Sequence, residues 1–87
     1  MHVIFDAKFK KMHAKVSEKI RIALNDRLNL FSIDRKNPLL NDHALSGKYF
    51  GYRSINITGD FRVVYTEVSE NIFRFVAIGT HHQLYGK

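Results

Sequence analysis

The sequence predicts a small α+β domain, and a change of period along the chain supports that prediction. Apolar residues recur at helical spacing in residues 1–40, whereas from Lys48 onward aromatic and β-branched residues follow the two-residue period of strands. Two short polar segments divide this second region and are short enough for antiparallel hairpins. We therefore expect one N-terminal strand, two helices and a three-stranded antiparallel meander, with the helices packed on one face of the sheet.

The first half of the chain contains the predicted N-terminal strand and both helices. Met1–Phe5 is a short apolar run that predicts a strand, and Asp6 can cap a short helix that continues through Met12. A second helix is predicted over Ala14–Phe31, because one apolar stripe recurs there at three- and four-residue spacing. The stripe consists of Val16, Ile20, Leu24, Leu28 and Phe31. The polar residues of 32–42, with Pro38 among them, predict a connecting loop.

The second half predicts the meander, with strands at Tyr49–Ile57, Phe61–Val68 and Ile72–Gly79. Because side chains alternate across a strand, Ile55 and Ile57 should face the helices. Three polar residues should then lie on an open face of the sheet: Ser54, Asn56 and Arg62. The third strand is apolar on both sides, which predicts a central position in the sheet but does not orient its side chains.

Composition narrows the class of protein. The 87 residues predict one domain over 1–87, and a hydrophobic fraction of 45% is enough for a core. The chain has no cysteine, so neither a disulfide nor a thiolate nucleophile is available. No apolar run approaches the roughly 20 residues that a membrane span needs. We expect a soluble cytoplasmic protein with no membrane association.

The net charge of +6 indicates a polyanion or an acidic protein as partner. The charge is unevenly distributed. Residues 1–40 hold nine Lys and Arg against four acidic residues, whereas residues 41–87 hold five against four. A solvated helical surface alone would also explain the lysines of the first half, so charge does not by itself establish nucleic-acid binding.

Polar groups with catalytic chemistry gather at three places near the ends of the predicted strands. Asp42-His43 precedes the first meander strand, Asp60 lies in a hairpin just before Arg62, and His81-His82 follows the last strand. An open sheet face flanked by these places could form a shallow basic cleft. Two adjacent histidines without cysteine or a clear third ligand are a poor zinc site, so we expect no metal and no cofactor.

Four segments in order resemble motifs of the RelE/ParE toxin superfamily, and of its YafQ branch in particular. The family pattern D-H-x-L-x-G is similar to residues 42–47, and its G-Y-R matches residues 51–53. Its aromatic-rich strand with a tyrosine is similar to residues 60–65, and its terminal G-[TS]-H-x-x-L-[FY] to residues 79–85. The resemblance covers about residues 42–86 with near-constant spacing, and residues 1–40 agree with it in the order of elements.

The resemblance implies a RelE-like fold and a ribosome-dependent endoribonuclease. In this chemistry the ribose 2′-oxygen attacks the adjacent phosphate and expels the 5′-oxygen of the next nucleotide. Matching by motif, His81 is the expected general acid, and His43 acts as base or positions the RNA. Asp60 accepts a proton or orients a histidine, Tyr85 stacks on a base or contacts phosphate, and Arg62 stabilises the phosphorane.

The chain departs from the YafQ pattern on the first meander strand, where Ser54 and Asn56 replace the usual Asp and His. These side chains can hydrogen-bond a substrate but cannot act as acid or base near neutral pH. The identity of the general base therefore stays open, as does full activity. The expected substrate-binding residues are Lys48, Arg53, Ser54, Asn56 and His82.

The expected partners are messenger RNA on the ribosome and a cognate antitoxin, with no small-molecule cofactor. An acidic, partly disordered antitoxin segment would suit the positive surface, and Ile22 and Leu30, which lie off the apolar stripe, are candidate contacts. Two other readings stay open: a ParE-like inhibitor of DNA gyrase, and a catalytically impaired or non-catalytic RNA- or ribosome-binding protein. The terminal histidine motif favours the nuclease.

Overall fold

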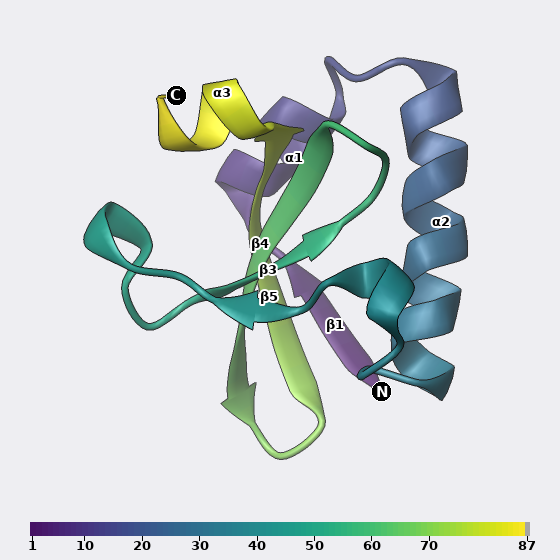
Figure 1. Ribbon diagram of the computed structural model, residues 1–87, viewed down its shortest axis with the longest axis vertical. Coiled ribbons are helices and arrows are strands. Elements are labelled where there is room, and N and C mark those ends of the chain that lie inside the picture. The colour runs from purple at the N-terminus through teal and green to yellow at the C-terminus, as the bar shows by residue number, and fades with distance from the viewer. Residues whose placement is uncertain (87) are drawn as a thin grey trace.

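The computed structural model describes residues 1–86 and combines helices with a mixed sheet (Figure 1). This arrangement confirms the predicted α+β class. Its elements in chain order are β1 (His2–Phe5), α1 (Ala7–His13), α2 (Glu18–Ile33), the 3-10 turn η1 (Pro38–Leu40), β2 (His43–Ala44), the 3-10 turn η2 (Gly47–Tyr49), β3 (Arg53–Asn56), β4 (Phe61–Ser69), β5 (Ile72–Thr80) and α3 (His81–Tyr85).

The sheet has the strand order β1-β5-β4-β3-β2. β1 runs parallel to β5, with His2 opposite Ile72, and the other neighbours are antiparallel. β5 therefore lies between β1 and β4, which confirms the central position predicted from its two apolar faces. The short strands β1 and β2 form the two edges.

The helices α1 and α2 each begin at a capping side chain. The carboxylate of Asp6 accepts a hydrogen bond from the Phe9 amide at 2.8 Å, so α1 begins where predicted. The hydroxyl of Ser17 accepts from the Ile20 amide at 3.3 Å, so α2 begins at Glu18. The predicted start at Ala14 was wrong, because the chain turns between the two helices before Ser17 restarts helical hydrogen bonding.

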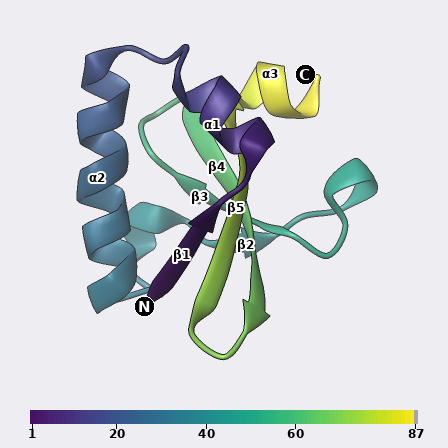
Figure 2. The same cartoon turned by 180° about the vertical axis from the view of Figure 1, so that it is seen from behind.

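The main core lies between one face of the sheet and the helices α1 and α2. Figure 2 shows these two helices beside the sheet in the view from behind. Phe31 of α2 packs edge-on against Tyr65 and Phe73, with ring centroids 5.1 Å and 5.0 Å away. Ile55 and Ile57 are buried in the same cluster, which confirms the direction predicted for them.

The opposite face of the sheet is also covered, which corrects the expectation of an open face. A second cluster of Tyr49, Val64, Ala77 and Leu84 is buried there, under α3 and the segment around η2. Ser54, predicted to face solvent, is 0% exposed. Sequence reasoning missed α3, the element that supplies Leu84 to this cover.

A bulge in β5 changes which of its residues face the helices partway along the strand. Val64 pairs with Ala77 and Tyr65 pairs with Phe75, so Val76 has no partner in the register. The extra residue shifts the alternation, and Ile78 joins Phe75 in the helix-side core while Ala77 lies in the second cluster. Strict two-residue alternation could not have assigned both ends of this strand.

The first meander strand is much shorter than predicted. The strand expected at Tyr49–Ile57 is only Arg53–Asn56, because Tyr49 ends η2 and Gly51 takes a left-handed φ of 91°. Residues 45–52 instead form a projecting loop (Figure 1).

No helix within residues 1–86 combines the length and the apolar character that a membrane crossing requires.

Candidate functional site

The paired strands β2 and β3 at the edge of the sheet place the polar side chains around residues 42–54 on opposite faces of the sheet. His43 lies opposite Ser54 in the register, and Ala44 lies opposite Arg53. Because neighbouring residues on a strand point to opposite faces, Asp42 and His43 separate. His43 joins Ser54 on the side of the second cluster, whereas Asp42 contacts Arg53 at the edge of the helix-side core.

The histidine pocket, as we call it, is a cavity of about 520 Å³ on the side of the second cluster. Its walls come from β2, the η2 loop and α3, so His43 and His81 meet there although they are far apart in the sequence. Both histidines are exposed to solvent. The lining residues are His43, Leu45, Ser46, Gly47, Lys48, Tyr49, His81, Leu84 and Tyr85.

The junction of β5 and α3 fixes the position of His81. The His81 amide donates to the Asp60 carbonyl at 3.0 Å, so the β3–β4 hairpin supports the start of α3. Thr80 and Gln83 form a capping box, with bonds of 3.1 Å and 2.8 Å between their side chains and backbone amides. A Cβ atom on Gly79 would lie 2.9 Å from Gln83 Oε1, so glycine at this position leaves room for the cap.

Tyr85 links His81 to the sheet. Its hydroxyl donates to Ser54 Oγ at 3.0 Å, and its ring contacts that of His81 at 4.8 Å between centroids. The Tyr49 ring packs edge-on against Tyr85 from the other side, at 6.1 Å. Ser54 is therefore buried against Tyr85 and does not reach solvent, whereas the Tyr85 ring forms a wall of the pocket.

A backbone carbonyl sets the hydrogen-bonding state of His43. The His43 Nδ1 atom lies 2.7 Å from the Asn41 carbonyl oxygen, which can only accept a hydrogen bond. Nδ1 must therefore carry the proton, and in the neutral ring Nε2 is the nitrogen that can accept one. Asn41 presents its carbonyl from a left-handed conformation, with φ of 46°.

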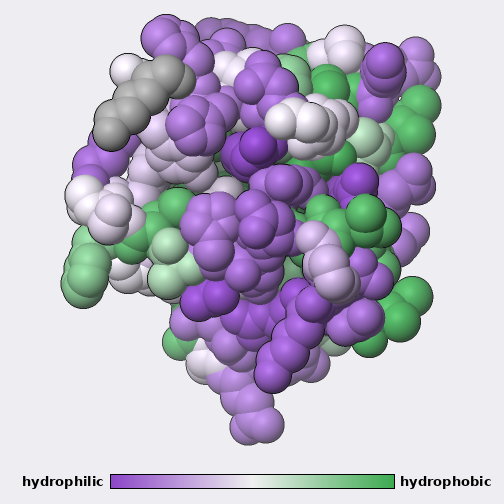
Figure 3. Space-filling view, viewed as in Figure 1, coloured by the Kyte–Doolittle hydropathy of each residue, from purple (hydrophilic) through white to green (hydrophobic). Residues whose placement is uncertain are grey.

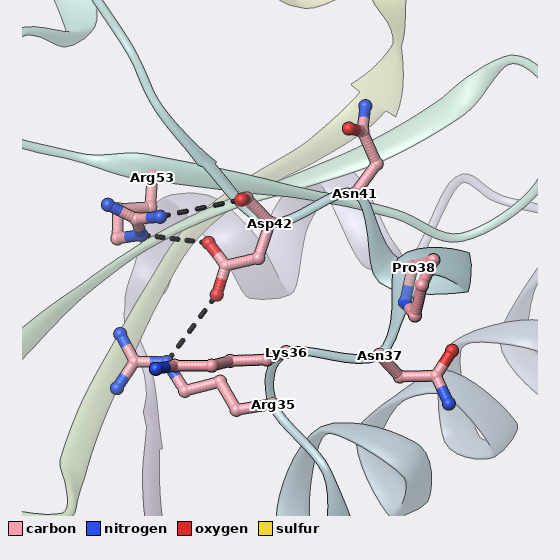
Figure 4. Close-up of a pocket in the computed structure, with 7 residues that line it drawn as sticks. All are labelled: Arg35, Lys36, Asn37, Pro38, Asn41, Asp42 and Arg53. Carbon is pink, nitrogen blue, oxygen red and sulfur yellow. Dashed lines mark hydrogen bonds and ion pairs between the residues drawn. The ribbon is translucent and has the colours of Figure 1, made fainter.

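On the other side of the strand, Asp42 is the centre of a group of polar residues that we call the Asp42 cluster: Arg35, Asp42, Arg53 and Tyr65. Figure 4 shows how the two arginines lie around Asp42. Its carboxylate accepts from Arg53 Nε at 2.8 Å, Arg35 Nε at 3.4 Å and the Tyr65 hydroxyl at 2.6 Å. The Asp42 side chain is only 10% exposed. Burial, together with the hydrogen bond to Asp42, raises the pKa of Tyr65 to about 12.

The arginines of the Asp42 cluster are held by further contacts. The Arg35 guanidinium lies 4.9 Å from the centre of the Phe73 ring and also pairs with Glu67 at 3.1 Å. The hydrogen bond that Arg53 donates to the Asp42 carboxylate raises the pKa of Arg53 above its usual value. Sequence reasoning noted Asp42 only as part of a motif and missed this cluster. The presence of Arg35 and Arg53 near Asp42 in the sequence was the available signal. Which charges pair depends on the register between β2 and β3, which the sequence does not give.

The structure brings together only part of the predicted site. Lys48 lines the histidine pocket with His43, His81 and Tyr85, whereas Arg53 belongs to the Asp42 cluster. His82 is exposed on α3 and does not line the pocket.

Arg62, Asp60 and Asn56 lie around the β3–β4 hairpin. The Arg62 guanidinium donates to the carbonyls of residues 58, 59 and 61 at 3.0–3.2 Å, so it stabilises the turn. The Asp60 side chain is exposed at the tip of this turn. Asn56 is half-buried, and its Oδ1 has no hydrogen-bond partner within residues 1–86. In the same described range, no group of three or more His, Asp or Glu side chains is arranged to hold a metal ion.

Comparison with known proteins shows the family and the fold of the chain. Residues 1–86 match the model of the family described as a bacterial toxin of type II toxin–antitoxin systems, YafQ. No curated protein sequence matches the chain. A crystal structure of YafQ from E. coli strain BL21(DE3) has a TM-score of 0.77 at 22% identity, covering 97% of each chain.

Two further solved structures have the same fold. The E. coli DinJ–YafQ toxin–antitoxin complex matches with a TM-score of 0.74 at 24% identity, over 97% of this chain and 96% of the other. A YoeB/ParE toxin from Agrobacterium tumefaciens matches with a TM-score of 0.72 at 19% identity, over 93% and 99%. The chain therefore has the expected RelE-like fold and belongs to the YafQ family of bacterial toxins of type II toxin–antitoxin systems.

Proposed function

We propose that this toxin is an endoribonuclease that cleaves messenger RNA on the ribosome. The observation that supports the proposal is the histidine pocket, where His43 and His81 share one exposed cavity with Lys48. One imidazole can remove a proton while the other delivers one, and an ammonium group can offset the charge that develops on phosphorus.

In the proposed reaction His43 is the general base. Its Nε2 takes the proton of the ribose 2′-hydroxyl, and the 2′-oxygen then attacks the adjacent phosphorus. The Asn41 carbonyl keeps the proton on Nδ1, so the ring presents its basic nitrogen without needing to change tautomer. His81 is the general acid and gives a proton to the 5′-oxygen as the P–O bond breaks, which leaves a 2′,3′-cyclic phosphate.

Electrostatic stabilisation of the phosphorane falls to Lys48, the cation that lines the pocket. Arg62, the sequence-based candidate for this role, would have to exchange its carbonyl acceptors on residues 58, 59 and 61 for phosphate oxygens. The Asp60 carbonyl supports the amide of His81, and Tyr85 orients the His81 ring. Ser54 then acts through Tyr85 and makes no direct contact with RNA.

The proposed protein partner is a cognate antitoxin. The proposal is supported by the solved toxin–antitoxin complex of the related E. coli YafQ with DinJ. The net charge of +6 favours an acidic antitoxin segment. Of the two expected contacts, Ile22 is 56% exposed, whereas Leu30 is half-buried against the main core. Unchanged antitoxin affinity in an Ile22→Ser variant would rule this patch out as a contact.

The deciding experiment is primer extension on a defined transcript in a reconstituted translation system, comparing the wild type with His81→Ala. We expect new 5′ ends at codon-phased positions with the wild type and at least a 100-fold lower yield with the variant, roughly the contribution of a general acid. Intact transcript with both proteins would refute the proposal. Gyrase inhibition or a non-catalytic RNA-binding role would then have to be tested.

A further inference from the structure

The loop formed by residues 47–52 is anchored to the body of the protein by two of its aromatic rings. Tyr49 is 9% exposed and packs edge-on against Tyr52 and Tyr85, with centroids 6.4 Å and 6.1 Å away. The Phe50 amide donates to the Gly47 carbonyl, and the Tyr52 amide to that of Tyr49, both at 3.0 Å. The loop therefore holds a defined shape although it projects from the sheet (Figure 1).

The third aromatic residue of this loop points away from the core. Phe50 is 81% exposed, although it directly follows the buried Tyr49. Seven large hydrophobic side chains within residues 1–86 are exposed, and Phe50 is the only aromatic residue among them. Single exposed aliphatic residues are common on protein surfaces, but an exposed ring at the end of an anchored loop is well placed to contact a planar ligand.

The surroundings of Phe50 are basic and adjoin the proposed site. The ammonium groups of Lys48 and Lys8 lie 5.2 Å and 5.8 Å from the centre of the Tyr49 ring, so two cations lie close to a ring that anchors the loop. Residues 47–49 line the histidine pocket, and Phe50 follows them directly. Hydrophilic residues predominate over the centre of the face seen in Figure 3, whereas apolar residues lie at its left and right edges.

We propose that Phe50 is a stacking platform for an unpaired base of single-stranded RNA. This inference rests on the proposed function, because it places the base beside the nucleotides that His43 and His81 would cleave. The Phe50 ring would cover one face of the base, while Lys48 and Lys8 contact phosphate oxygens on either side. Such a contact tolerates any sequence, because every base has a π face, and it adds to affinity without taking part in the chemistry.

The test measures binding without cleavage. The probe is a short 2′-O-methyl oligoribonucleotide containing 2-aminopurine, whose fluorescence falls when the base stacks, and which lacks the 2′-hydroxyl needed for cleavage. We expect the wild type to quench the probe, and Phe50→Ala and Phe50→Leu to lose the quenching and bind about 10-fold more weakly. Phe50→Trp should retain both properties, because it preserves an aromatic face.

The matched control is Ile33→Ala, since Ile33 is 83% exposed and lies at the end of α2. This variant should bind like the wild type. The proposal is overturned if the wild type does not quench the probe, or if Phe50→Leu binds as tightly as the wild type. It is also overturned if Phe50→Ala weakens only antitoxin binding, which would assign the residue to a protein interface. Because the probe cannot be cleaved, each of these outcomes leaves the proposed nuclease chemistry to be judged by primer extension.

Discussion

Asp42 and His43 are neighbours in the chain, yet they lie in two regions with opposite character. On the Asp42 side, the carboxylate is 10% exposed and accepts from two arginines and a tyrosine, so its hydrogen-bonding capacity is largely used. On the His43 side, the ring is exposed. Its Nδ1 donates to the Asn41 carbonyl, whereas Nε2 has no hydrogen-bond partner within residues 1–86. The first region is therefore built to stabilise the fold, and the second has the accessible groups that the proposed chemistry needs.

Strand geometry accounts for this division. A single step along β2 reverses the direction of the side chain, so one edge strand can serve a packed cluster and a solvent-filled pocket together. The two regions share a backbone but no side-chain hydrogen bond connects them within residues 1–86. Substitutions on the two sides should therefore affect different measurements.

The largest expected effect belongs to His43→Ala. Cleavage should fall by about 100-fold or more, because the proposed base is lost, while the free energy of unfolding changes by less than about 0.5 kcal/mol for an exposed side chain. The measurements are primer extension and urea denaturation. His2→Ala, at an exposed histidine of β1, serves as the control and should change neither value. Cleavage by His43→Ala at the wild-type rate would contradict the assignment.

Asp42→Ala should show the converse. Its removal leaves two arginines and the Tyr65 hydroxyl without their shared acceptor, at a cost of about 2 kcal/mol in unfolding free energy. This value is below that of a fully buried ion pair, because the Arg35 and Arg53 side chains are 35% and 40% exposed. Asp42→Asn keeps an acceptor for Tyr65 and should lose about half as much. Asp26→Ala, at an exposed site on α2, is the control, and equal stability of Asp42→Ala and Asp26→Ala would refute the role.

The stability of the protein at alkaline pH tests the Asp42 cluster through Tyr65. The pKa of Tyr65 is about 12 in the folded protein and about 10 in the unfolded chain. Between these values the unfolded chain releases the proton first, so stability falls as pH rises from 10 to 12, by about 2 to 3 kcal/mol. Urea denaturation across this range should show the loss in the wild type and a smaller slope in Tyr65→Phe. A Tyr52→Phe control with the same reduced slope would contradict the assignment to Tyr65.

The smallest expected effect is at the contact between Ser54 and Tyr85. Tyr85→Phe removes one hydrogen bond and should lower the unfolding free energy by about 1 kcal/mol. A double-mutant cycle with Ser54→Ala should return a coupling energy of similar size. Cleavage should fall less than in His43→Ala, because the Tyr85 ring remains against His81. A coupling energy near zero would show that the hydroxyl contact does not hold Tyr85.

Local patterns predicted much of the fold. The Asp6 cap located α1, and periodicity located α2, the hairpins and the central position of β5, because these depend on residues close together in the chain. Boundaries failed where a single side chain or backbone conformation decides them. Ser17 starts α2, and Gly51 keeps the chain before Arg53 out of the sheet. The helix α3 has only one turn, so its apolar Leu84 shows no period, although Thr80 and Gln83 have the spacing of a capping box.

The candidate site could be predicted in its residue types but not in its arrangement. Motif order selected His43, His81 and Tyr85, and the structure places all three around one pocket with Lys48. Alternation placed Ser54 on the correct face but could not show that α3 covers it. The pairing of Asp42 with Arg53 and Arg35 depends on the register of β2 and on the end of α2, which no local pattern encodes.

The parallel pairing of β1 with β5 has a consequence for the timing of synthesis. Residues 2–5 emerge from the ribosome long before residues 72–75, which are their partners in the sheet. The central strand, and with it the main sheet, can assemble only after nearly all of the described chain has been made. His81 and Tyr85 follow that strand, so the pocket they line is completed later still. During translation the growing chain therefore contains His43 but no finished site.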